Sequence, residues 1–499
     1  MRVALTATLL SLLACEEAPR FASWDVVRAP HPAWSSEAAG PEPAAADDFR
    51  AYPPTGTAAA LPELPVISET TLPSGVRVLV LERHSLPLAS IGIVVARGAA
   101  QAPAGVAEMA ARMLFEDTTR IEGDRLKQDL SEMGAEWNTS ALYDAVTIDA
   151  KLPATNAGGA LRVLTEVLRS PTFPEEHFEV MKSQLIASLD HDATSPKGAS
   201  EEALETLLYP VGQPYREPGG GDPEAVQRVR RDDLVAFWRA SAVPSLTTYV
   251  VAGDVDRSAV VTELGTLVGD WSGSGSARMP LPDAGLPTGP RTVVLDHPGD
   301  PQAVVRIGWL GPDRDSPDIP KLRTLAATLG HDASGRVGSL YRALRIERGE
   351  TYGVNASIVP RLGASELVIE TAVERDGAGD ALRAIFAAID RIRTKPVDEV
   401  ALLGTQDILR VREWKALETC SDVVAALTPV AAYREPLDTF FAELHGTTSS
   451  REEIQAVAKR YLGEPSRAVV VVGDAVQLRP ALEAAGLRDV AVRPLAAAR

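Results

Sequence analysis

The chain has 499 residues, with 50 Lys and Arg against 68 Asp and Glu, so its formal net charge is −18. Such an acidic balance argues against nucleic acid and against an anionic membrane surface as partners, because both carry negative charge themselves. The length suits two domains of ordinary size. Two cysteines in the whole chain, Cys15 and Cys420, provide no disulfide framework.

The first fourteen residues, MRVALTATLLSLLA, combine one basic residue, a short apolar run and small residues before Cys15. This run is too short to span a membrane and predicts a signal peptide at 1–14. The sequence LLAC at 12–15 resembles a bacterial lipobox, which implies lipidation of Cys15 and a place in the bacterial cell envelope, facing the periplasm. The alternative is a plain signal peptide followed by a chance cysteine. Without residues 1–14, one Arg fewer leaves a net charge of −19.

Residues 15–62 are rich in Ala, Pro and acidic side chains and predict a flexible tether. A folded body follows, with strands expected within 72–82, 87–98 and 137–152, because these segments alternate and are rich in β-branched residues. Helices are expected over 105–119, 157–169, 175–192 and 199–208. A helix over 232–241 then leads into a buried strand over 246–255.

A Gly-, Pro- and Ser-rich stretch over 271–290 predicts a linker between two halves, 63–270 and 291–490. The halves repeat one another, since 233–254 matches 453–474 and 160–162 matches 381–383 at almost the same offset. An offset about as long as a whole half indicates a duplicated domain and not a solenoid repeat. We therefore expect an α+β fold of two homologous tandem domains, each an antiparallel-rich sheet with helical hairpins on one face.

The helix expected over 105–119 carries an apolar stripe with helical spacing, formed by Val106, Met109, Ala110, Met113 and Leu114. Glu108 and Arg112 lie four residues apart in the order that favours a helical ion pair. Taken alone, this is an ordinary amphipathic helix with one buried face.

The sequence of that helix, GVAEMAARMLFEDT, resembles the zinc segment G-L-A-H-x-x-E-H-M-L-F-x-G-T of the pitrilysin/insulinase metallopeptidase family. In that family the two His bind zinc and the Glu activates water. Here Glu108 and Arg112 stand at the His positions and Ala111 at the position of the base. The third ligand of the family, a downstream Glu, aligns with Ser188 or its neighbour Leu189. The resemblance implies a degenerate zinc site, no cofactor bound by this chain, and two domains enclosing a cleft.

A second segment, GRVGSLYRALRIERGETYGV at 335–354, resembles the other signature of the family, in which an Arg and a Tyr seven residues apart follow a Gly/Ser-rich loop. The matching residues are Arg345 and Tyr352. Leu340, Leu344 and Ile346 support a helix there, and Gly349 predicts its end. A guanidinium and a phenol at one corner can both donate hydrogen bonds to a peptide carbonyl or its oxyanion. The alternative is a solvated helix charge beside a half-buried strand aromatic.

In two-chain members of the family, one chain keeps H-x-x-E-H while the other lacks zinc and keeps the Arg/Tyr pair. The resemblance therefore implies a non-catalytic subunit that joins a zinc-bearing homologous peptidase subunit and an unfolded peptide substrate, with Arg345 and Tyr352 acting in the partner's active site. One alternative is a structural or binding scaffold of the envelope, with no role in proteolysis. Another is an active peptidase with an unconventional site, which the absence of a base at Ala111 opposes.

Overall fold

The computed structural model describes residues 65–276, 291–330, 338–444 and 448–495. The expected signal peptide, Cys15 and the expected tether lie outside these ranges, as does most of the expected linker. Within them, no helix is both long enough and apolar enough to cross a membrane.

The first half forms a six-stranded sheet in the order β1-β2-β6-β3-β5-β4. β2 and β6 pair in parallel, and the other neighbours pair antiparallel. The strands are β1 (Ile67–Thr71), β2 (Arg77–Glu82), β3 (Leu88–Val95), β4 (Glu136–Ala141), β5 (Val146–Pro153) and β6 (Thr247–Gly253). The helices are α2 (Val106–Met113), α3 (Gly123–Glu132), α4 (Ala157–Arg169), α5 (Glu175–Thr194), α6 (Pro196–Leu208), α7 (Pro223–Arg228), α8 (Arg231–Ser241) and α9 (Arg257–Val268).

The second half forms another six-stranded sheet in the order β12-β7-β11-β8-β10-β9. The strands are β7 (Thr292–Asp296), β8 (Gln302–Leu310), β9 (Thr351–Val359), β10 (Glu366–Glu374), β11 (Ala468–Gly473) and β12 (Val490–Pro494). The helices are α10 (Ile319–Leu329), α11 (Ser339–Tyr341), α12 (Ala378–Thr394), α13 (Glu399–Lys415), α14 (Cys420–Ala432), α15 (Leu437–Leu444), α16 (Arg451–Tyr461) and α17 (Ala475–Ala484). A π-helical turn over Arg342–Ile346 follows α11.

The duplication predicted from the sequence is visible in the topology. α8 begins at Arg231 and its counterpart α16 at Arg451, while α4 begins at Ala157 and its counterpart α12 at Ala378, so the offsets found in the sequence recur in the structure. The central strands repeat in the same order, β2-β6-β3-β5-β4 in one half and β7-β11-β8-β10-β9 in the other. The predicted fold class, two homologous mixed α and β domains, is therefore confirmed.

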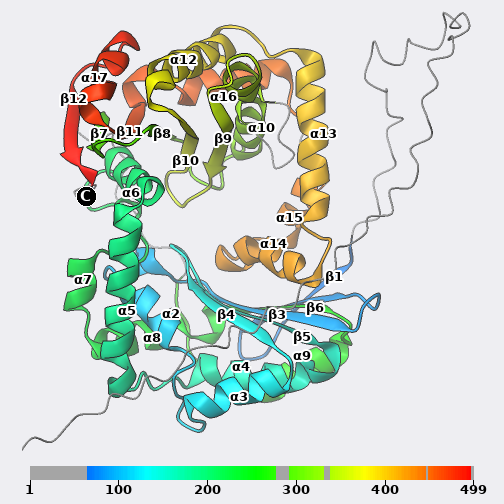
Figure 1. The fold of residues 1–499 in the computed structure, drawn as a ribbon. Coiled ribbons are helices and arrows are strands. Elements are labelled where there is room, and N and C mark those ends of the chain that lie inside the picture. Colours follow the sequence, from blue (N-terminus) through cyan, green and yellow to red (C-terminus); the bar gives the residue numbers. More distant parts are fainter. Residues whose placement is uncertain (1–64, 277–290, 331–337, 445–447, 496–499) are drawn as a thin grey trace, which may run out of the picture. The chain divides into compact units, whose positions relative to one another are not determined.

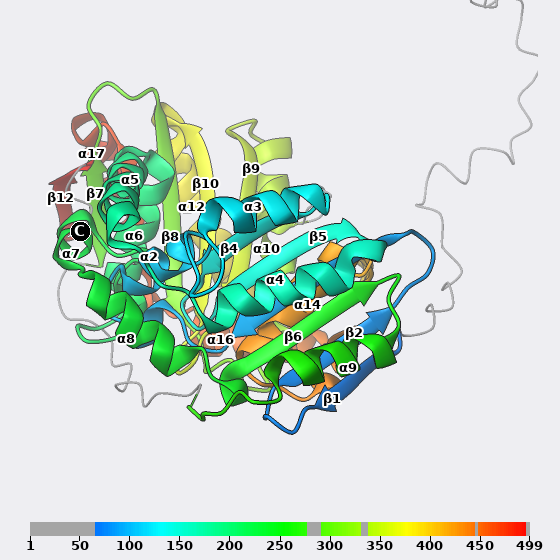
Figure 2. The same cartoon turned by 90° about the horizontal axis from the view of Figure 1, so that it is seen from below.

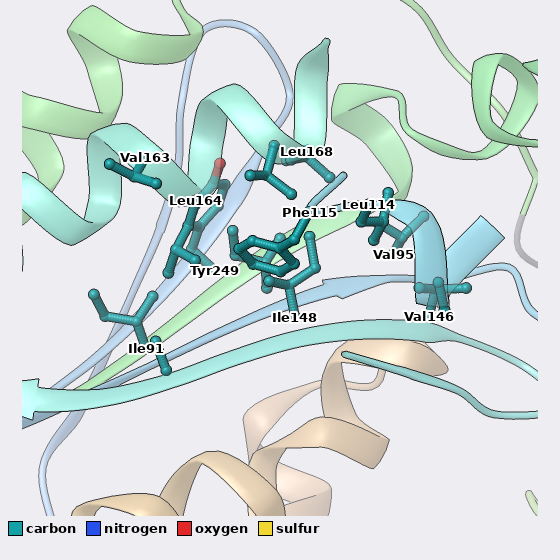
Figure 3. Packing of buried hydrophobic residues seen from close by; sticks show 14 of the residues in the cluster. Ile91, Val95, Leu114, Phe115, Val146, Ile148, Val163, Leu164, Leu168 and Tyr249 are labelled. Atoms are coloured by element: carbon teal, nitrogen blue, oxygen red, sulfur yellow. The ribbon is translucent and has the colours of Figure 1, made fainter. Parts of the chain in front are cut away.

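Each sheet buries one face beneath helices of its own half. In the first half, α4 packs on β3 and β5 while α9 packs on β2, and both helices lie over this face of the sheet in Figure 2. The core between them contains the apolar stripe of α2 and residues such as Ile91, Ile148 and Leu164, all fully buried (Figure 3). Strand residues that alternate toward the helices supply the other side of this core, as the period of two requires.

The opposite face of each sheet is covered by a helix from the other half, which the sequence did not indicate. α14 of the second half packs on β3 and β6 of the first sheet, and α6 of the first half packs on β8 and β11 of the second (Figure 1). Leu427 of α14 and Leu204 of α6 are each 1% exposed within these two further cores. The prediction of helices on one face therefore describes only part of the packing.

A buried polar network also joins the two halves. The Arg361 guanidinium lies 3.1 Å from Glu205 Oε1 of α6 and 2.9 Å from Glu366 Oε1 of β10. Its Cζ stacks 4.1 Å from the ring centroid of Tyr143. Asp144 accepts hydrogen bonds from two further tyrosines, one in each half, Tyr215 and Tyr433. One guanidinium thus contacts two buried carboxyl groups that belong to different halves.

Candidate functional site

α2, the helix that resembles a zinc helix, is held by close backbone packing at its start. Gly105 precedes it at φ +82°, in the left-handed region that favours glycine. A Cβ on Gly105 would lie 2.7 Å from Val226 Cγ2, and one on Gly221 would lie 2.6 Å from the Gly105 nitrogen. The two glycines therefore let the chain enter α2 against the loop before α7.

The ion pair predicted from the spacing is present on α2. Arg112 Nε donates to Glu108 Oε1 at 2.7 Å, and the two side chains are 36% and 21% exposed. Glu108 lies in the first turn and Arg112 in the last, where the helix dipole favours each charge. Ala111, between them in sequence, is buried. Its carbonyl accepts a hydrogen bond from Thr139 Oγ1 of β4 at 2.9 Å, which ties the helix to the edge strand.

Ser188 and Leu189, the aligned third-ligand positions, lie on α5, and α5 packs on α2. Both side chains are half-buried, and Leu189 packs against the apolar core of the first half. Neither carries a group that binds zinc well. α5 thus lies beside α2, but these two positions supply no ligand.

The residues at this site do not fit a zinc ion. The one carboxylate, Glu108, is engaged by the permanent cation Arg112, which repels a metal. Ala111 has no group that could activate water. Among the residues that the structure describes, no group of three or more His, Cys, Asp or Glu is placed to hold a metal. No hydrolytic step can be derived from α2.

Arg345 and Tyr352 are brought together at the start of β9. Arg345 Nη1 donates to the Thr351 carbonyl at 3.1 Å, and its Cζ lies 4.9 Å from the ring centroid of Tyr352. Tyr352 is 89% exposed, so the half-buried alternative for this aromatic is wrong. Gly349 adopts φ +69° after the π-helical turn, as expected of a helix stop. Of the three residues that supported a helix here, Leu340 and Leu344 are fully buried and Ile346, the last residue of the π-helical turn, is 68% exposed.

The pair and the α2 site are separate in the described residues, where no hydrogen bond or ion pair joins them. Each lies next to a strand at the edge of a sheet: β4 beside α2, and β9 at Tyr352. An edge strand offers unpaired backbone groups to an added strand. At the edge strand β9 the structure thus presents two hydrogen-bond donors, a half-exposed guanidinium and an exposed phenol, beside unpaired backbone groups.

One candidate residue was missed by the sequence reasoning. Asp149 of β5 lines a cavity of about 620 Å³ between the first sheet and α14. Burial raises the pKa of this carboxyl, and a hydrogen bond from Thr147 opposes that rise. The sequence contains a signal that could have found Asp149. It is an acidic residue in the middle of the strand-like run VTIDAKL, and it follows Ile148, so its side chain lies on the opposite face of the strand.

Two family models match the chain. Residues 77–217 match Insulinase (Peptidase family M16), and residues 228–409 match Peptidase M16 inactive domain. Together they cover more than half of the chain. A solved structure of a peptidase M16 inactive domain from Pseudomonas fluorescens is 21% identical, with a TM-score of 0.71 over 82% of this chain and 98% of that one. This likeness shows the shared fold.

Curated relatives are distant and match in part. A probable mitochondrial-processing peptidase subunit beta of Arabidopsis thaliana is 22% identical over 52% of this chain and 50% of its own length. An uncharacterized zinc protease of Mycobacterium leprae is 24% identical over 58% and 66%. A non-peptidase homologue of Helicobacter pylori is 23% identical over 36% and 42%. The chain thus spans between 42% and 66% of the length of these relatives.

Proposed function

Because the chain belongs to the M16 (insulinase) peptidase family, we propose that it is a non-catalytic subunit that works with a zinc-bearing M16 partner. In this role it binds part of an unfolded peptide and supplies Arg345 and Tyr352 to the partner's active site. The zinc belongs to the partner, since the residues of this chain do not fit it. The inactive-domain match and the non-peptidase relative support a chain without catalysis of its own.

The observation that carries the proposal is the contrast between the two motif sites. At α2 the two His positions of the motif hold an ion pair and the position of the base holds an alanine, whereas at β9 both hydrogen-bond donors are present and stacked on one another, with the phenol open to solvent. A tyrosine 89% exposed contributes almost nothing to the stability of the fold. Its presence beside the guanidinium is explained by a partner or a substrate that contacts both.

The first experiment is purification of the tagged chain from its native envelope and identification of partners present in equal amount by mass spectrometry. An equimolar homologue with H-x-x-E-H supplies the complex to assay. In that complex Arg345→Ala should lower the peptide cleavage rate at least tenfold, because one oxyanion donor is typically worth about 3–4 kcal/mol. Arg342→Ala, an exposed arginine of the same π turn, is the matched control and should leave the rate unchanged.

A loss of less than twofold for Arg345→Ala with the partner bound would refute the role of the pair. Tyr352→Phe provides a second reading, because it removes the hydroxyl alone from an exposed ring and should also slow cleavage. If the chain is recovered alone, or with unrelated envelope proteins, the scaffold alternative is favoured instead. The envelope location proposed from Cys15 is tested in the same preparation by the mass of the N-terminal peptide, which carries lipid if the cysteine is modified.

A further inference from the structure

α14 covers one face of the first sheet, and this face is apolar over β3 and β6 and polar toward β4. Over β3 and β6 the sheet packs against Val424 and Leu427 of α14. Toward the β4 edge, the same face turns polar and borders the cavity of about 620 Å³. The polar and charged side chains that line this part are Ser90, Glu136, Asn138, Ser140, Thr147, Asp149, Lys151, Ser421 and Thr428.

Asp149 lies at the centre of this polar face, and no basic side chain of the described residues forms an ion pair with it. Its hydrogen-bond partner among those residues is Thr147, at 2.9 Å. The basic side chain on this face, Lys151, instead forms an ion pair with Glu136, with 3.4 Å between Nζ and Oε2. Asn138, opposite Asp149 on β4, donates to Ser140. A half-buried carboxylate without a cation is costly unless something else neutralises it.

The duplicated half shows what fills the equivalent place there. On β3, Gly92 pairs with Val250 on one side and with Asp149 on the other. On β8, Arg306 pairs with Val470 and with Glu370 in the same register. Since Val250 and Val470 occupy matching positions of the sequence repeat, Gly92 is the counterpart of Arg306, and Asp149 is the counterpart of Glu370.

The guanidinium of Arg306 forms an ion pair with Glu370 and lies 3.6 Å from Glu201 of α6, with its side chain 8% exposed. The second half therefore supplies its own cation to the carboxylate of this face. In the first half the cation position is a glycine, and a Cβ there would lie 2.4 Å from Val424 Cγ1 and 3.2 Å from Asp149 Oδ1. The carboxylate is kept, its internal partner is absent, and a cavity borders it.

We propose that Asp149 and the cavity around it bind the cationic side chain, guanidinium or ammonium, of an extended peptide that pairs with β4. A strand added to β4 would lie about 10 Å from β5, two strand spacings away. An extended arginine side chain reaches roughly 7 Å from its Cα, so it can cross β4 and approach the Asp149 carboxylate. Side chains of the added strand that share the face of Asn138 and Ser140 point over the cavity.

This inference rests on the proposed peptide-binding function and specifies the class of peptide, namely one with a basic residue. The test uses the mature chain and two otherwise uncharged extended peptides that differ at one central position, arginine in one and citrulline in the other. Citrulline keeps the shape and removes the charge. Binding is measured by fluorescence anisotropy. We expect the arginine peptide to bind about tenfold more tightly, because only its side chain can make a charge-assisted hydrogen bond to the carboxylate.

Asp149→Asn should reduce that preference to less than twofold, whereas Asp232→Asn, a control at an exposed carboxylate of α8, should leave it intact. N-acetyl-arginine amide is tested separately by saturation-transfer NMR, because a single residue needs no strand pairing. If both peptides bind with equal affinity, the cation site is refuted while peptide binding stands. If the small probe binds wild type and not Asp149→Asn while neither peptide binds, the cation site stands and the peptide-binding role fails. If neither the peptides nor the probe binds, both are refuted.

Discussion

The protonation of Glu205 makes the stability of the protein depend on pH, because this residue belongs to the buried network that joins the two halves. Replacing Glu205 by glutamine should remove that dependence. Burial and the negative charge of Glu366 raise the pKa of Glu205 from 4.5 to about 8, against the opposing effect of Arg361. The geometry agrees with a raised pKa, because a single guanidinium contacts both carboxyl groups and its one positive charge can balance only one of them. A proton on Glu205 relieves their repulsion.

The sign of the pH effect follows from proton binding. Between pH 4.5 and about 8 the folded chain holds a proton on Glu205 that the unfolded chain has released. The contribution of this group to the free energy of unfolding is therefore fully present below pH 4.5. It falls by up to about 1.4 kcal/mol per pH unit on the way to pH 8. Glutamine resembles the protonated acid. It can accept from Arg361 and donate to the Tyr143 hydroxyl, which in turn can donate to the Glu217 carbonyl 3.0 Å away.

The assay is urea unfolding from pH 5 to 9 for wild type, Glu205→Gln and the control Glu224→Gln, whose side chain is 91% exposed. As pH rises, the free energy of unfolding of wild type should fall relative to that of Glu205→Gln. At pH 9 the variant should therefore be the more stable protein. Glu224→Gln should follow wild type throughout. A Glu205→Gln variant that is destabilised by the same amount at every pH would refute the argument, since the carboxylate would then be ionised in the folded chain.

Three further outcomes follow from the packing and the sites. Leu427→Ala, in the α14 core, should lower the free energy of unfolding by about 2–5 kcal/mol, while Leu403→Ala on α13, 55% exposed, should have little effect in the same urea titration. Combining Glu108→His, Ala111→Glu and Arg112→His with Ser188→Glu, or with Leu189→Glu in a second variant, should create binding of one zinc per chain by elemental analysis; stoichiometric zinc in wild type would contradict the degenerate site. Asp149→Asn should keep or raise the Tm at pH 8, because burial raises the pKa of Asp149 and its ionised form opposes folding; a clear drop in Tm would mark a structural role.

Local patterns in the sequence predicted much of the fold. The stripe of α2 is buried where the helical period placed it, and α4 occupies 157–169 as expected. The duplication also followed from the sequence, since a constant offset between matching segments is visible without any knowledge of contacts. The close approach of Arg345 and Tyr352 agrees with a helix stop at Gly349 followed directly by a strand.

Features that depend on contacts between distant segments could not be read in this way. Nothing in the pattern of α14 or α6 says that each covers the sheet of the other half, because an apolar face specifies burial and not a partner. The pairing of Arg361 with Glu205 spans 156 residues. The equivalence of Gly92 with Arg306 needs the strand register, which shows that two unlike residues occupy one position.

The exchange of α6 and α14 has the reciprocity of a two-fold symmetric homodimer, in which the same surface is used on both subunits. In a protein made of one such half, an apolar face of the sheet would stay exposed to solvent unless the helix of a second copy packed on it. Such a protein would therefore be an obligate dimer. Fusion of two copies then converts that association into a single chain. It also allows the two halves to differ, as they do at the ion pair on α2 and the Arg/Tyr corner at β9. A chain cut between residues 276 and 291 should accordingly reassemble from its two pieces, with neither soluble without the other.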